Sequence, residues 1–142
     1  MEPISPANTS GEARAKAVES ERQNRVEAAF LEGLRRRMPE HAGVLESLGC
    51  LYTEMGRYEE GLDADREMVR LQPHSPLAWY NLACSLSLTG QADAAFAALG
   101  KAVDRGYSDA DWMQGDKDFD PIRSDPRFAA LLAQVQARSA LA

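Results

Sequence analysis

The chain of 142 residues is poor in the residues that most often build catalytic and metal centres, with two cysteines and two histidines. Two cysteines are too few for a disulfide framework, and neither stands in a Cys-x-x-Cys pair. The sequence also lacks a glycine-rich phosphate loop, a Gly-x-Ser-x-Gly motif and a His-Glu-x-x-His motif. We therefore expect a protein that is not an enzyme and that holds no cofactor.

Long apolar runs are absent too, since no stretch approaches the roughly 18 apolar residues of a membrane-spanning helix. The first residues, Met-Glu-Pro-Ile-Ser-Pro, have neither the basic nor the apolar region of a signal peptide. These observations predict a cytoplasmic protein with no membrane partner.

The charge balance is acidic, with 22 Asp and Glu against 16 Lys and Arg and a net charge of −6. The excess lies after residue 41, because the first 41 residues carry seven charges of each sign. Nucleic-acid binding needs basic residues that neutralise phosphates, so we expect no nucleic-acid partner.

One acidic stretch has the alternation of a calcium loop, with Asp116, Asp118 and Asp120 at every second position. Such a loop then needs a glycine and, at its twelfth position, a glutamate that binds the ion with both oxygens. This chain has Pro121 and Arg127 at those positions. The sequence therefore predicts no calcium site.

A spacing of 34 residues organises the middle of the chain. When 42–75 is aligned with 76–109, apolar and small positions coincide, for example Leu48 with Leu82 and Gly61 with Ala95. A period of this length indicates a helical repeat in which each unit is one helix pair. Three identical pairs share the spacing: Pro39 and Pro73, Cys50 and Cys84, and Gly56 and Gly90.

Boundary signals place the helices of these repeats. Ser75-Pro76 offers an N-cap hydroxyl followed by a proline at the first helical position. Gly56 and Gly90 can end helices in the left-handed conformation. We predict helices at about 42–55, 58–71, 76–89 and 92–105, with the closest helix crossings at Gly61 and Ala95.

The N-terminal part divides into two segments. Residues 1–10 contain Pro, Ser, Asn and Thr and little apolar content, which predicts a disordered tail. Residues 11–41 are rich in Ala, Glu and Arg and predict one long amphipathic helix. The 34-residue frame aligns Leu34 with Met68, so we interpret this helix as a degenerate repeat that has lost its first helix.

The repeated residues resemble the tetratricopeptide repeat (TPR) family. The similarity spans about 42–132 and includes a C-terminal segment, Asp118-Phe-Asp-Pro-Ile-Arg with Asp125-Pro-Arg-Phe, found at the end of many bacterial arrays. It implies an all-α, right-handed solenoid with repeats at 42–75 and 76–109 and a cap at 110–142. We expect the final helix to start at Pro126 and these apolar residues to cover the open end of the stack: Trp112, Phe119, Ile122, Phe128, Leu131 and Leu132.

The resemblance also implies a concave groove formed by the first helix of each repeat. Residues spaced three and four apart share one face of a helix, which gives two sets of candidate groove residues. Asn81 resembles an asparagine of the family whose amide can hold a peptide backbone; the alternative is that it only ties one repeat to the next. The candidate peptide-binding residues are Glu46, Cys50, Thr53, Leu77, Tyr80, Asn81, Cys84 and Ser87.

The two cysteines occupy equivalent places in successive first helices. We expect their Cα atoms to be on the order of 10 Å apart, beyond the roughly 7 Å that a disulfide permits. Both thiols are expected to be accessible from the groove. We therefore interpret Cys50 and Cys84 as small groove residues, and a redox or metal role is the alternative.

These residues predict a non-catalytic adaptor or scaffold that binds a basic or apolar segment of a protein or peptide. The family's grip on a C-terminal carboxylate is excluded, because Glu46 and Asp111 would repel it. One alternative is a small secretion-type chaperone that holds an unfolded partner segment. Another is a self-associating module in which Phe30 and Leu34 of the N-terminal helix form a homo-oligomer contact.

Overall fold

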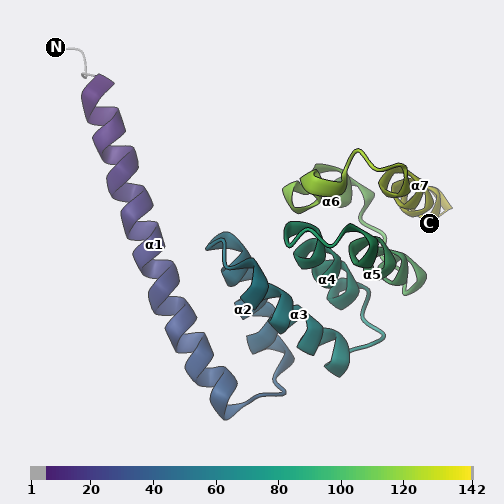
Figure 1. Ribbon diagram of the computed structural model, residues 1–142, viewed down its shortest axis with the longest axis horizontal. Coiled ribbons are helices and arrows are strands. Elements are labelled where there is room, and N and C mark those ends of the chain that lie inside the picture. Colours follow the sequence, from purple (N-terminus) through teal and green to yellow (C-terminus); the bar gives the residue numbers. More distant parts are fainter. Residues whose placement is uncertain (1–5, 142) are drawn as a thin grey trace.

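The computed structural model describes residues 6–141, and every regular element in this range is helical, which confirms the all-α prediction (Figure 1). None of the helices in this range combines the length and the apolarity needed to cross a bilayer. The elements are α1 (Pro6–Arg37), α2 (Ala42–Glu54), α3 (Tyr58–Leu71), α4 (Pro76–Leu88), α5 (Ala92–Asp104), α6 (Ala110–Gly115), the 3-10 helix η1 (Lys117–Ile122) and α7 (Pro126–Leu141).

The four repeat helices lie within one residue of the predicted ranges. The Ser75 hydroxyl accepts a hydrogen bond from the Ala78 N–H at 3.2 Å, and Pro76 follows at the first helical position. One period earlier, His41 Nδ1 takes the same role toward Val44. Gly56 and Gly90 have φ angles of 75° and 77°, so both helix-ending signals are confirmed.

Helices α2, α3, α4 and α5 pack in chain order as stacked helix pairs, the arrangement of TPR-like repeats (Figure 1). An added Cβ at Gly49 on α2 would lie 2.6 Å from Asp65 Oδ1 on α3, so the Asp65 side chain lies directly against Gly49. At Gly61 an added Cβ would meet Thr53 Oγ1 at 3.4 Å, an ordinary contact. It would also lie 3.5 Å from the Gly49 carbonyl oxygen, so the predicted crossing position on α3 faces the backbone of Gly49 on α2.

The C-terminal elements close the far end of the stack. Phe119 and Val135 are fully buried in one core with Leu99 and Val103 of α5. Leu131 and Leu132 pack against the same core, as expected of a cap. The Phe119 ring meets the Tyr80 ring edge-on, with 5.3 Å between centroids.

The C-terminal half of α1 packs against the first repeat. Leu31 and Leu34 contact a buried cluster that contains Val44, Leu48 and Tyr52. One period later Met68 contacts Ala78 in the equivalent way, which is consistent with a degenerate repeat.

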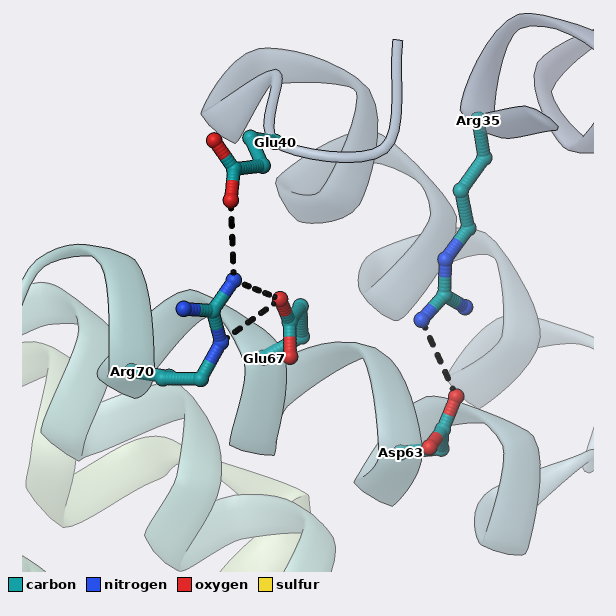
Figure 2. Close-up of polar contacts among 5 residues, drawn as sticks. All are labelled: Arg35, Glu40, Asp63, Glu67 and Arg70. Carbon is teal, nitrogen blue, oxygen red and sulfur yellow. Dashed lines mark hydrogen bonds and ion pairs between the residues drawn. The ribbon is translucent and has the colours of Figure 1, made fainter. Parts of the chain in front are cut away.

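Ion pairs add to this contact. Arg35 of α1 donates to Asp63 of α3 at 3.1 Å (Figure 2). Arg70 of α3 forms ion pairs with Glu67 of the same helix and with Glu40 of the α1–α2 loop. Each pair has at least one largely exposed partner, so each contributes little stability compared with the apolar cluster.

The N-terminal half of α1 stands away from the stack (Figure 1). Residues 10–23 are all exposed. The predicted tail is only partly testable, because 1–5 lie outside the described residues. Residues 6–10 belong to α1, so that part of the prediction was wrong: Pro6 is tolerated in the first turn, and the alanine-rich helix continues back to it.

Candidate functional site

The stack holds a cleft of about 630 Å³ between the first helices of the repeats and the cap. Helices α2 and α4 form two walls, and the α6–η1 segment forms a third. Asp65 reaches the cleft from α3. The lining residues are Gly49, Cys50, Thr53, Glu54, Asp65, Tyr80, Asn81, Cys84, Ser85, Asp111, Trp112, Gly115, Asp116, Lys117 and Asp118.

The structure brings five of the eight predicted groove residues to this cleft, namely Cys50, Thr53, Tyr80, Asn81 and Cys84. Glu46 is exposed outside the cleft lining. Leu77, with 48% of its surface exposed at the start of α4, also lies outside it.

Ser87 is the third residue outside the lining, and it is fully buried. Its hydroxyl donates to the Asp118 carbonyl oxygen at 2.7 Å, so it holds η1 against α4. The groove is therefore shorter than the sequence predicted, because the cap covers one end of α4. Binding by the five remaining residues stays a prediction.

Tyr80 and Asp116 form the floor of the cleft. The Tyr80 hydroxyl donates to Asp116 Oδ2 at 2.7 Å, and its ring stacks on Tyr107 with 4.3 Å between centroids. Burial, together with this hydrogen bond to a carboxylate, raises the pKa of Tyr80. Asp116 Oδ1 accepts from the Asp118 N–H at 3.0 Å, so both oxygens of Asp116 are already satisfied.

A second buried carboxylate, Asp65, forms part of the wall. Its side chain is 5% exposed and accepts a hydrogen bond from the Ser85 hydroxyl at 2.5 Å. Burial raises the pKa of Asp65 to about 6, and the Ser85 hydrogen bond opposes the shift. Asp65 therefore carries most of its charge at neutral pH despite its burial.

Three more carboxylates, Glu54, Asp111 and Asp118, complete an acidic lining that has Lys117 as its one basic residue. Asp118 is half-buried, and burial with neighbouring Asp116 and Asp120 raises its pKa. Within residues 6–141, none of these three carboxylates has an ion pair or a side-chain hydrogen-bond donor. The cleft therefore presents uncompensated negative charge to solvent.

The prediction that Trp112 belongs to the apolar core of the cap was wrong. Trp112 was expected to cover the apolar end of the stack, but 64% of its surface is exposed on the cleft wall. The neighbouring Met113 is fully buried instead. Successive residues on a helix point about 100° apart, so Trp112 and Met113 cannot both face the core. The sequence offered no sign of which one would do so.

The two cysteines differ in a way that the repeat alone did not show. Cys50 is exposed, whereas Cys84 is 7% exposed beneath Asp116, 3.7 Å from its Oδ2. The prediction of two accessible thiols was wrong, because the cap covers Cys84. Desolvation, together with nearby carboxylates, raises the pKa of both thiols, which disfavours a reactive thiolate and a redox role.

Cys84, Asp116 and Asp118 each place one candidate ligand atom within 4.8 Å of the other two. The Asp116 oxygens already accept hydrogen bonds from Tyr80 and the Asp118 backbone. This trio is therefore better explained as part of the cleft floor than as a cation site.

Comparison with known proteins agrees with the helical repeat. A tetratricopeptide repeat matches residues 77–105, which cover most of α4 and α5. A chloroplastic protein of Arabidopsis thaliana is 32% identical over 89 residues. That alignment covers 61% of this chain and 27% of the relative, so the chain spans about a quarter of that protein's length. The bacterial type, the closing segment and the cytoplasmic location stay predictions.

Proposed function

We propose that this chain is a non-catalytic adaptor that binds an extended segment of a partner protein in the cleft. The observation that supports the proposal is the cleft itself, an open 630 Å³ hollow with walls from α2, α4 and α6–η1. Tetratricopeptide repeats in general are protein-interaction modules, and one such repeat forms the α4 wall. The unpaired carboxylates favour basic segments, and Trp112 favours segments with apolar or planar groups.

The secretion-type chaperone has less support. A chaperone for unfolded chains needs walls that accept apolar residues of many shapes. Five carboxylates line this cleft, and burying them against an apolar segment would cost desolvation energy. Selection of purely apolar peptides would favour the chaperone over the adaptor.

Cys50 supplies a direct test, because it is the accessible thiol and lies in the cleft. Random dodecapeptides displayed on phage are selected against the immobilised full chain. The selected peptides are then tested for binding to protein that carries fluorescein maleimide on Cys50. We expect the bulky label to abolish binding. The control is Cys50→Ser exposed to the same reagent, which stays unlabelled at this position and should still bind. Peptides that bind labelled protein equally well would contradict the proposal.

Self-association is a second candidate, supported by the exposed face of α1. Val18, Val26 and Phe30 are 63%, 65% and 66% exposed and lie within one side of the helix. Leu34, predicted for this contact, packs within its own chain instead. Sedimentation equilibrium tests this candidate: a dimer that Phe30→Ser dissociates and Leu77→Ser leaves intact would support it, and a monomeric wild type would contradict it.

A further inference from the structure

Arginine stacking on aromatic rings recurs in this chain. Arg57 lies 4.7 Å from the centre of the Tyr52 ring and also forms ion pairs with Glu32 and Glu60. A guanidinium can do both at once because its face is free to stack while its edge donates hydrogen bonds.

The same combination occurs at two places in the second repeat and the cap. Arg127 lies 4.3 Å from the centre of the Phe96 ring and forms ion pairs with Asp93 at 2.8 Å and Asp125 at 2.9 Å. Arg123 lies over Phe128 and donates to Asp120 at 3.2 Å. An arginine held between an aromatic face and carboxylates is therefore a repeated structural unit of this protein.

The cleft lining contains an exposed aromatic ring and unpaired carboxylates, the two components of such a unit, and no arginine. Trp112 is largely exposed and lines the cleft together with Glu54, Asp111 and Asp118. In the part of the chain that the structure describes, no cation lies over Trp112. Lys117 is exposed and forms no ion pair there.

We propose that Trp112 and the unpaired carboxylates form a subsite for an arginine side chain of the bound partner segment. This inference rests on the proposed binding of a protein segment in the cleft. Tryptophan attracts cations more strongly than other aromatic residues do. The fixed fork of a guanidinium can also bond two carboxylate oxygens while it stacks, whereas an ammonium is a compact, strongly hydrated charge without a planar face. The subsite therefore prefers arginine to lysine.

The peptides selected by phage display supply the probe. The tightest cleft-binding dodecapeptide that contains arginine is synthesised with arginine, lysine or citrulline at that position; citrulline keeps the shape of arginine and lacks its charge. Fluorescence anisotropy then measures binding to wild type, Trp112→Ala and Leu77→Ala. Leu77 is an exposed apolar residue outside the cleft lining and is the matched control. Thermal unfolding confirms that each variant is folded.

We expect arginine to be enriched among the selected peptides, and its replacement by lysine or citrulline to weaken binding about tenfold. Trp112→Ala is expected to lower affinity for the arginine peptide by a similar factor and to remove the difference between arginine and lysine. Leu77→Ala should change neither value.

Two results would overturn the inference in distinguishable ways. Peptides that bind the cleft without any dependence on arginine or Trp112 would exclude the arginine subsite and leave the adaptor function standing. Failure to select any peptide that the Cys50 label displaces would exclude both.

Discussion

Among single residues, Asp65 is the most deeply buried carboxylate of the cleft. A carboxylate that is 95% buried loses most of its hydration, and one hydroxyl from Ser85 replaces only part of it. A neutral side chain of the same shape would avoid this cost. The charge of Asp65 adds to the negative potential of the cleft, and its hydrogen bond with Ser85 joins α3 to α4.

Asp65→Asn is predicted to change the pH dependence of stability. The pKa of Asp65 is raised from 3.8 to about 6 in the folded chain, so the native state holds the proton at pH values where the unfolded state has lost it. Ionisation of Asp65 therefore lowers the free energy of unfolding as pH rises from about 4 to about 6, by up to roughly 3 kcal/mol. The asparagine variant lacks this contribution, and its advantage over wild type should be largest at pH 7 and vanish near pH 4.

Urea denaturation at several pH values between 4 and 7 measures this difference, with Asp104→Asn as a control at an exposed site. Parallel pH profiles for wild type and Asp65→Asn would show that Asp65 titrates normally and that its burial carries no electrostatic cost.

At the scale of elements, the cap is both part of the core and a wall of the cleft. Phe119 of η1 is fully buried between Tyr80 of α4 and Phe128 of α7. Trp112 of α6 contributes little to this core, since most of its surface faces solvent. Phe119 therefore serves the structural role of the cap, and Trp112 serves its proposed binding role.

Phe119→Ala is predicted to lower the free energy of unfolding by about 3–5 kcal/mol, because it leaves a cavity in the centre of the core. Trp112→Ala should change it by no more than about 0.5 kcal/mol, as is usual for exposed positions. Chemical denaturation of both variants measures the two effects. A small loss for Phe119→Ala would mean that the cap is not integral to the fold.

The elements were predictable where local signals determine them. The four repeat helices follow from Ser75-Pro76, the terminal glycines and the 34-residue period, and they agree with the structure within one residue. Tertiary contacts decide the rest. The choice between Trp112 and Met113 as the buried residue depends on how α6 lies on α7, which neither period nor capping specifies.

For the whole molecule, the site was predictable only in part. The repeat register brings together the α2 and α4 walls, including Cys50, Tyr80, Asn81 and Cys84. The third wall comes from residues 111–118, outside the two clear repeats, and its folding over α4 buries Cys84 and Ser87. The acidic composition after residue 41 predicted a negatively charged groove, and the structure shows which carboxylates line the cleft.

The most direct test of the account is a ¹⁵N–¹H NMR titration of the full chain with the tightest selected arginine peptide. The protein has two indole N–H groups, those of Trp79 and Trp112. Trp79 is an internal reference, because it lies outside the cleft lining and its indole N–H donates to the Pro73 carbonyl oxygen at 2.8 Å. We predict a saturable shift of the Trp112 indole signal and of cleft amides, with little change at Trp79. A Trp112 signal that stays still while signals of α1 or Trp79 shift on binding would contradict the proposed site.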